Sequence, residues 1–316
     1  MLVFRGVPQR ATTSTVLTIG NFDGVHRGHR ALLERLVAKA RACALPATVL
    51  TFEPHPREFF APAEAPARLS NLREKLELLA DCGVDRVHVC RFNAALAALT
   101  ADQFIERILV SGLSVRHLII GDDFCFGKGR QGNFSLLQQA GAAHRFVVEA
   151  MPTIAQGSLR VSSSAVRDAL AAGDIAGASA LLGRPYVIAG RVMQGKKIGR
   201  TLGFPTLNLR IKHARLAVSG IFAVTVAGID AQPLPGAANI GVRPTLADGL
   251  RPVLEVHLLD FDRDIYGAHV TVNFLRKLRD EEKFASLDLL KAQITRDVAA
   301  VRAYFDACSN DGKTNG

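Results

Sequence analysis

The stretch that decides the fold reads Gly20-Asn21-Phe22-Asp23-Gly24-Val25-His26-Arg27-Gly28-His29. It follows an apolar β-type run, Val16–Ile19, and precedes a helical pattern, Arg30–Ala42. A strand, a glycine turn and a helix together offer bare backbone N–H groups and a helix N-terminus to a phosphate group. Gly24 and Gly28 would let a phosphate approach closely, and each imidazole can donate a hydrogen bond to it. The alternative, from these residues alone, is a tight turn between strand and helix with two solvated histidines.

Outward from this turn, residues 1–183 alternate short β-rich runs with helical stretches. The candidate strands are Val16–Ile19, Ala47–Phe52, Arg86–Val89, His117–Ile120 and Arg145–Glu149. Helical patterns lie between them, for example Asn71–Cys82 and Ala101–Val110. This alternation predicts an α/β fold with a doubly wound parallel sheet and helices on both of its faces.

Three turn-forming segments follow strands in this half of the chain. They are the histidine turn, Pro54-His55-Pro56 and Gly121-Asp122-Asp123. Ligands of doubly wound sheets bind beyond the carboxyl ends of the strands. We therefore expect the three segments to share one edge of the sheet and to form an active site there.

After Gly183 the pattern changes to strands without helix-length insertions. The candidate strands are Tyr186–Val192, Ile221–Val226, Pro252–Leu259 and His269–Phe274. This spacing predicts a small antiparallel β-barrel. One amphipathic helix, Leu287–Phe305, follows the barrel. The predicted domains are therefore 1–183 and 184–308, with a polar, disordered tail at 309–316.

Composition fits two globular domains that bind small anions. The chain has 316 residues, 48% of them hydrophobic, which is enough for two cores of ordinary size. The net charge of +10 is spread over both halves, with 20 basic against 16 acidic residues up to Gly183 and 19 against 13 after it. A diffuse positive surplus suits polyanionic substrates such as ATP, and equally a weak, non-specific affinity for nucleic acid.

The cysteines indicate a reducing compartment. There are five of them, and none forms a C-x-x-C pair: Cys43, Cys82, Cys90, Cys125 and Cys308. An odd, scattered set argues against a disulfide framework and against a zinc knuckle. No apolar run approaches the roughly 18 residues of a membrane span, and the N-terminus has no signal-peptide pattern. The predicted location is the cytoplasm.

Two short patterns match well-known motifs only in part. Gly127–Gly132 fits G-x-G-x-x-G, but the dinucleotide fingerprint should directly follow a strand and open a helix. Here Phe124 and Phe126 intervene, so a flexible basic flap over an anionic ligand fits better. The segment from Gly190 nearly fits the P-loop, but Lys197 stands where the loop needs Ser or Thr for Mg²⁺. We reject the P-loop for this reason.

Three further stretches carry suitable chemistry. Val161–Arg167 places three serines before a helical pattern, where serine is also an ordinary N-cap. In Gly199–Asn208, Thr206 and Asn208 present oxygen atoms on one side of an extended segment, as Mg²⁺ beside a triphosphate requires. Glu255 alternates with apolar neighbours, and a carboxylate on a rigid strand suits a general base. The alternative for Glu255 is a solvent-facing side chain on an outward strand face.

With these motifs the chain resembles the bacterial bifunctional riboflavin kinase/FAD synthetases over about residues 15–305. The turn matches G-N-F-D-G-V-H-x-G-H, and residues 195–208 match G-x-x-x-G-R-x-L-G-F-P-T-x-N. Residues 161–167 match the I-S-S-T-x-x-R motif of the nucleotidyltransferase superfamily, with Ser164 in place of Thr. The resemblance implies a Rossmann-like adenylyltransferase domain followed by a riboflavin kinase barrel. Riboflavin and ATP would give FMN and ADP in the barrel, and FMN and ATP would give FAD and pyrophosphate in the first domain.

The resemblance also implies roles for residues of the first domain. His26, His29 and Arg167 would act on the transferred phosphate. ATP would be bound by Gly20, Asn21, Phe22, Asp23, Gly24, Gly28, Ser163 and Ser164. FMN would be bound by Pro54, His55, Pro56, Asp123, Phe126 and Arg130. Asn133 stands where members of the family often have Asp.

For the kinase, the resemblance implies that Glu255 deprotonates the ribityl 5′-hydroxyl of riboflavin as it attacks the γ-phosphorus of ATP. Arg279 would lie near the mouth of the flavin site. ATP would be bound by Gly195, Lys196, Gly199, Gly203, Pro205, Thr206 and Asn208. Thr206 and Asn208 would hold the Mg²⁺ that accompanies ATP.

Three other functions are weighed against this one. A nucleic-acid-binding protein would need clustered Lys and Arg with stacking aromatic residues, which an aromatic content of 6% without tryptophan disfavours. A nicotinamide-dependent oxidoreductase would rest on Gly127–Gly132. A flavin-binding regulator would have one inactive site, against which the intact Glu255, His26 and His29 argue. We expect neither a nucleic-acid nor a membrane partner, and the sequence predicts no oligomeric state.

Overall fold

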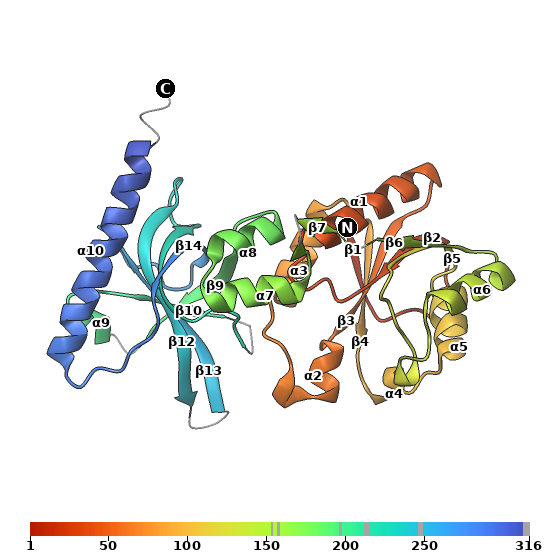
Figure 1. Cartoon of the computed structure of the whole chain (residues 1–316), viewed down its shortest axis with the longest axis horizontal. Helices are drawn as coiled ribbons and strands as arrows, with labels where there is room; N and C mark the ends of the chain where they lie inside the picture. The colour runs from red at the N-terminus through yellow and green to blue at the C-terminus, as the bar shows by residue number, and fades with distance from the viewer. Residues whose placement is uncertain (153, 157–158, 196–197, 212–214, 246–248, 312–316) are drawn as a thin grey trace. The chain divides into compact units, whose positions relative to one another are not determined.

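A computed structural model describes residues 1–152, 154–156, 159–195, 198–211, 215–245 and 249–311 (Figure 1). Its contacts divide the chain into two compact units, Met1–Pro66 with Leu72–Ser163 and Ala67–Asn71 with Ser164–Gly316. The division after Gly183 stays a prediction about domains that fold independently. No helix in the described part of the chain combines the length and the apolar composition of a membrane span.

The first unit is built on a parallel sheet of six strands. The strands are β1 (Leu2–Arg5), β2 (Thr15–Ile19), β3 (Ala47–Glu53), β4 (Arg86–Arg91), β5 (Val115–Gly121) and β6 (Val147–Met151). Their order across the sheet is β1-β4-β3-β2-β5-β6, and each pair of neighbours is parallel. The predicted parallel sheet is confirmed. The prediction lacked β1. This short edge strand has four exposed residues and therefore no buried face that a sequence pattern could indicate.

Helices cover both faces of this sheet, as predicted for a doubly wound fold. Helices α1 (Arg27–Ala42) and α3 (Leu72–Asp81) pack against the face that carries Val16. Leu17, the next residue of β2, packs on the opposite face with α5 (Ala101–Phe104) and its π-helical continuation, and with α6. The π-helix spans Ile105–Gly112 and α6 spans Phe134–His144. The shorter elements are α2 (Pro56–Phe60), α4 (Ala94–Ala97), two 3₁₀ turns (Pro62–Glu64 and Lys128–Arg130) and the hairpin β7 (Ala155–Gln156) and β8 (Leu159–Arg160).

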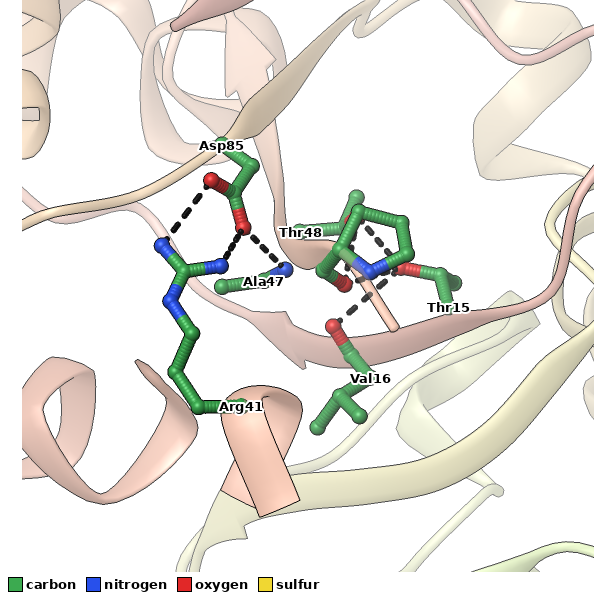
Figure 2. A network of polar contacts seen from close by, with 7 residues as sticks. Thr15, Val16, Arg41, Ala47, Thr48 and Asp85 are labelled. Carbon is green, nitrogen blue, oxygen red and sulfur yellow. Dashed lines mark hydrogen bonds and ion pairs between the residues drawn. The ribbon is translucent and has the colours of Figure 1, made fainter. Parts of the chain in front are cut away.

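A polar network fastens the amino ends of the central strands (Figure 2). The carboxylate of Asp85 accepts hydrogen bonds from Arg41 at 2.8 and 3.0 Å and from the backbone N–H of Ala47 at 2.8 Å. The hydroxyl of Thr15 bonds to that of Thr48. The Arg41 guanidinium lowers the pKa of Asp85 below its usual range. These contacts stabilise the amino edge of the sheet. The ligand is expected at the opposite edge, beyond the carboxyl ends of the strands.

The second unit contains a closed antiparallel barrel, which confirms the predicted barrel. Its strands are β9 (Val187–Met193), β10 (Leu207–Arg210), β11 (Gly220–Ala227), β12 (Leu234–Thr245), β13 (Gly249–Leu258) and β14 (His269–Arg279). They close in the order β10-β13-β12-β11-β14-β9. The prediction lacked β10 and β12. Pro235 and Gly236, the second and third residues of β12, are typical of turns, and for this reason the strand was not predicted.

The remaining helices are α7 (Ser163–Ala172), α8 (Ile175–Leu182), α9 (Ile198–Thr201) and α10 (Leu287–Asp311), and all of their residues except Ser163 belong to the second unit. Helix α10 packs on the outer face of the barrel, where Val301 meets Ala223 of β11 and Leu259. It runs six residues beyond the predicted end at Phe305, so that residues 309–311 of the predicted tail are helical. Residues 312–316 of that tail lie outside the described residues.

Candidate active sites

The first cavity lies at the carboxyl edge of the parallel sheet, where β2 and β5 are neighbours, and has a volume of about 300 Å³. From β2 the chain continues to β3 on one side, whereas β5 and β6 lie on the other side. This reversal of strand order is where doubly wound sheets bind their ligands. The walls come from the histidine turn after β2, from 121–124 at the end of β5, from Met151, Pro152 and Ile154 at and after the end of β6, and from 160–163.

The histidine turn has an unusual backbone. Phe22 and Val25 have φ angles of 48° and 39°, in the left-handed region, beside Gly24 at 79°. Non-glycine residues, and β-branched valine above all, rarely adopt this conformation because of a cost of about 1–3 kcal/mol each. Both side chains are fully buried in the core, which holds the turn in place. As a result α1 begins at Arg27, three residues before the predicted start, and His29 lies in its first turn.

The two histidines stack on one another. Their ring centroids are 3.7 Å apart, and the rings are inclined by 16°. His26 is the N-cap of α1, and its Nδ1 accepts a hydrogen bond from the backbone N–H of His29 at 3.3 Å. A neutral His26 ring therefore carries its proton on Nε2. Nδ1 of His29 is buried, and no described residue donates or accepts a hydrogen bond there.

The surroundings keep His29 uncharged. Burial lowers the pKa of His29 well below its usual value, and the nearby His26 and Lys75 lower it further. A neutral imidazole donates one hydrogen bond and adds no positive charge. His29 can thus orient a phosphate oxygen, while the charge of the phosphate has to be balanced by other groups.

Ser163 lines this cavity and contacts the backbone of Asp23. The Ser163 hydroxyl donates to the Asp23 carbonyl at 2.9 Å, which joins the serine motif to the histidine turn. Arg160 was absent from the sequence prediction. It lines the cavity, and its Nη2 lies 2.7 Å from Oδ2 of Asp123. The available signal was a cation shortly before the serine motif, which is too common a feature to single out.

The proline loop does not line the first cavity, in contrast to the expectation that three segments form one site. His55 is instead the N-cap of α2: its Nδ1 accepts from the N–H of Arg57 at 3.1 Å. The Glu58 carboxylate accepts from the N–H of His55 at 2.9 Å and completes a capping box. Pro54 and Pro56 flank this cap. The loop follows β3, which adjoins β2 on the side away from β5, so it belongs to the same edge but to a different place on it.

The aromatic residue that faces the first cavity is Phe124, whereas the sequence analysis named Phe126. Phe126 is only 6% exposed and packs in the core against Phe104 and Gly132. Phe124 stacks on Phe126 at 5.7 Å and forms part of the cavity wall. Phe124 is therefore a second aromatic candidate for contact with a flavin, and the contact predicted for Phe126 stays a prediction.

The loop after Phe126 is not a dinucleotide fingerprint. A bridge between Phe126 and Gly132 closes it, and Arg130 is exposed on its 3₁₀ turn. Asn133 is the N-cap of α6 and accepts from the N–H of Leu136 at 3.0 Å. This cap gives Asn133 a structural role at the position where Asp is frequent in the family.

Ser164 and Arg167 fall in the second compact unit. Ser164 is exposed, and Nε of Arg167 donates to the carbonyl of Ala67 at 2.6 Å. Their predicted contacts with ATP stay predictions.

The second cavity, of about 280 Å³, lies on the outer face of the barrel and is covered by α10 and residues 281–284. Leu254 and Val256 of β13 are fully buried, whereas Glu255 and His257 between and after them line this cavity. Glu255 and His257 therefore share one strand face, as their alternation with apolar neighbours predicted. That face is on the outside of the barrel, and Glu255 is half-buried in the cavity there.

Polar side chains from three neighbouring strands meet here. Glu255 of β13 is in register with Asn208 of β10 on one side and with Asn239 of β12 on the other. All three line the cavity. Asn239 was absent from the sequence prediction, because only strand register brings it beside Glu255.

The predicted ATP segment forms one end of this cavity. A Cβ on Gly199 would overlap the Phe204 carbonyl, so this position needs glycine, whereas a Cβ on Gly195 would displace the side chain of Asn208. The Pro205 carbonyl accepts from Nδ1 of His257 at 2.9 Å. Gly203, Pro205 and Thr206 follow in the same segment. Lys196 lies outside the described residues.

The donor set suits Mg²⁺ bound together with ATP. In the described ranges no three His, Cys, Asp or Glu side chains gather as a metal cluster. Thr206 and Asn208 offer a hydroxyl and an amide oxygen, and Nδ2 of Asn208 lies 3.5 Å from the Thr206 carbonyl, which leaves its Oδ1 for other partners. Mg²⁺ accepts such hard oxygen ligands and keeps most of its waters.

Arg279 lines the second cavity and is held by α10. Its Nε and Nη2 donate to the Asp297 carboxylate at 2.9 and 2.6 Å, and Gln293 donates to the same carboxylate at 2.9 Å. Hydrogen bonding to Asp297 raises the pKa of Arg279. The guanidinium lies 5.9 Å from the centroid of the Phe284 ring. Helix α10 thus holds the Arg279 side chain, which was predicted to lie near the mouth of the flavin site.

Comparisons with known proteins match both halves of the chain. A family model for FAD synthetase matches residues 8–165, and one for riboflavin kinase matches residues 182–305. A bifunctional riboflavin kinase/FMN adenylyltransferase from Escherichia coli (strain K12) is 52% identical over 96% of this chain and 98% of its own. One from Pseudomonas fluorescens is 53% identical over 91% and 92%, respectively. A solved structure described as a macrolide-efflux protein from Streptococcus pneumoniae has a TM-score of 0.78 at 29% identity and covers 96% of this chain and 99% of that one.

Proposed function

The chain belongs to the family of bifunctional riboflavin kinase/FMN adenylyltransferases, and from this premise we propose which residues perform its two activities. The FMN adenylyltransferase activity belongs to the N-terminal half and the riboflavin kinase activity to the C-terminal half. The observation that carries the assignment of residues is that each half has its own cavity, built around its own glycine-rich motif.

In the first cavity, an FMN phosphate oxygen attacks the α-phosphorus of ATP, and pyrophosphate leaves. His26 and His29 donate N–H groups to phosphate oxygens, and the free backbone N–H groups of the first turn of α1 add to them. Ser163 and Ser164 bind ATP, and Arg160 and Arg167 balance its charge. Such a transfer depends on positioning and charge neutralisation and needs no covalent intermediate with the protein.

The flavin of this first reaction binds beside the adenylyl site. Asp123 and Phe124 contact FMN from the cavity wall. The loop of Pro54, His55 and Pro56 contacts it from the neighbouring strand end. Phe126 and Arg130 also bind FMN, from the segment that follows β5.

In the second cavity, Glu255 accepts the proton of the riboflavin 5′-hydroxyl. The hydroxyl oxygen bonds to the γ-phosphorus, the bond from that phosphorus to the bridging oxygen breaks, and ADP leaves. His257 fixes the backbone at Pro205 and so positions the ATP segment. Thr206 and Asn208 would hold Mg²⁺, which would neutralise charge on the phosphate oxygens. Arg279 borders the flavin.

The proposal also includes a cellular location and a set of partners. We place the protein in the cytoplasm, which is supported by cysteines that are all free in the structure. Its partners are the small molecules ATP, riboflavin and FMN, without nucleic acid or membrane.

One experiment tests both halves together. Purified protein is incubated with riboflavin, ATP and Mg²⁺, and the flavin products are separated by chromatography over time. FMN should appear first and FAD later, and supplied FMN should give FAD without a lag. Binding of riboflavin without any conversion would instead favour a flavin-binding regulator.

A further inference from the structure

Four residues on neighbouring strands form a row across the floor of the second cavity. They are Asn208 of β10, Glu255 of β13, Asn239 of β12 and Ile221 of β11, each in register with the next. All four line the cavity. Neighbouring strands are about 4.8 Å apart, so Glu255 and Ile221 are separated by two such steps, with Asn239 midway.

The chemistry changes in order along this row. Asn208 adjoins Thr206 and the ATP segment, and Glu255 is the proposed base. Beyond Asn239 the wall gains apolar side chains, Ile221 of β11 and Leu290 and Ile294 of α10, beside the Arg279–Asp297 ion pair. Riboflavin has the same order: a terminal hydroxyl, a polyol chain and a flat, largely apolar ring. A riboflavin with its 5′-hydroxyl at Glu255 and its ring at Ile221 therefore has its ribityl chain over Asn239.

Asn239 has an unfulfilled hydrogen-bonding need at this place. Its Oδ1 is buried, and no described residue donates a hydrogen bond to it. A buried amide oxygen without a donor destabilises the folded protein, so native structures keep few of them without a reason. The nearby guanidinium of Arg279 is already engaged by Asp297 and by the Asp280 carbonyl. A hydroxyl of the substrate is a donor of the right kind.

We propose that Asn239 binds the ribityl chain of riboflavin through this amide oxygen. It accepts a hydrogen bond from a secondary hydroxyl of the chain, and this contact sets the register in which the 5′-hydroxyl meets Glu255. The proposal deepens the proposed kinase function and rests on it. It makes Asn239 a residue that selects for a hydroxylated chain rather than for the flavin ring.

The test compares two substrates with one variant, Asn239→Ala. One substrate is riboflavin, and the other is the flavin with a 10-(5-hydroxypentyl) chain, which keeps the terminal hydroxyl and lacks the secondary ones. Removing a contact with a substrate hydroxyl should lower kcat/KM for riboflavin about 10- to 100-fold. For the hydroxypentyl flavin the same variant should change kcat/KM by less than about 3-fold, because this substrate has no secondary hydroxyl that could bind to Asn239.

The matched control is Asn273→Ala. Asn273 lies on β14 of the same barrel. Its Oδ1 is also buried, with no hydrogen-bond donor among the residues that the structure describes, but it does not line the cavity. This variant should affect both substrates equally. Conversion of supplied FMN to FAD by each preparation, together with a thermal melt, shows that the variant proteins are folded.

Equal losses of Asn239→Ala on both substrates would overturn the proposal, since they would mean a structural role. Unchanged turnover of riboflavin would overturn it as well. The role of Glu255 as the base is tested by a different variant. If Glu255→Gln kept its kinase activity, that role would be wrong, whatever the Asn239→Ala comparison of the two substrates shows.

Discussion

The first cavity is built at the ends of strands, whereas the second is built on their faces. At the strand ends, the walls are loops, and the two stacked histidines come from one continuous turn. On the strand faces, the polar groups are Asn208, Glu255 and Asn239, which come from three strands and meet only through register. A helix, α10, then covers the face and closes the site.

The two sites therefore differ in what fixes the positions of their functional groups. The turn depends on backbone conformation, with Phe22 and Val25 in left-handed geometry, and the surrounding core holds that geometry. The barrel face depends on side chains that a rigid ladder spaces at fixed intervals. Substitutions in the two cavities should therefore separate the two activities and should differ in what they change.

The largest effect is expected from Glu255→Gln. A positioned general base contributes about 10²–10⁴-fold to a proton transfer, and glutamine keeps the shape of the side chain without its basicity. FMN formation from riboflavin should fall by that factor, as measured by chromatography under saturating ATP. FAD formation from supplied FMN should stay as in the unchanged protein. Loss of both activities, or of neither, would break the division between the cavities.

The converse substitution is His29→Ala. Loss of one hydrogen-bond donor to a phosphate oxygen in the transition state costs about 10²–10³-fold in rate. FAD formation from FMN should fall by that factor, while riboflavin phosphorylation continues unchanged. The control is His144→Ala, because His144 is at the end of α6 and does not line the first cavity. FAD synthesis at the normal rate by His29→Ala would remove His29 from the mechanism.

A smaller effect is expected from Asp297→Ala, which releases Arg279 from α10. Loss of the two hydrogen bonds leaves a part-buried guanidinium without its partner, at a cost of about 1–3 kcal/mol in unfolding free energy. We expect this loss in urea unfolding and a higher KM for riboflavin, without a change in FAD formation from FMN.

The matched control is Asp260→Ala, whose paired Arg302 is also on α10. That pair is exposed and screened by water, so its loss should change little. Equal effects of the two variants would contradict the role assigned to α10.

How much the sequence predicts also differs between the two cavities. The histidine turn is contiguous, so its residues and its place after a strand were predicted from local pattern. Asn239 was not predicted as a site residue. Pro235 and Gly236, near the start of its strand, are typical of turns, and its pairing with Glu255 is formed only in the folded barrel. Phe124 was missed for a similar reason: the sequence shows two aromatic residues two positions apart, and only packing shows which of them lines the cavity.

The pH dependence of stability tests the turn independently of catalysis. Since burial lowers the pKa of His29 in the folded state, the unfolded state binds a proton first as the pH falls. The stability of the turn is therefore complete above the unfolded value of about 6.5 and is lost progressively as the pH falls below it. Urea unfolding of the unchanged protein between pH 7.5 and 5 should show this decline, and His29→Gln should show less of it because glutamine does not titrate. His144→Gln, at a half-exposed position, should decline like the unchanged protein. Identical slopes for all three would mean that His29 is protonated as readily in the folded turn as in the unfolded chain, and the neutral donor assigned to the first cavity would then be wrong.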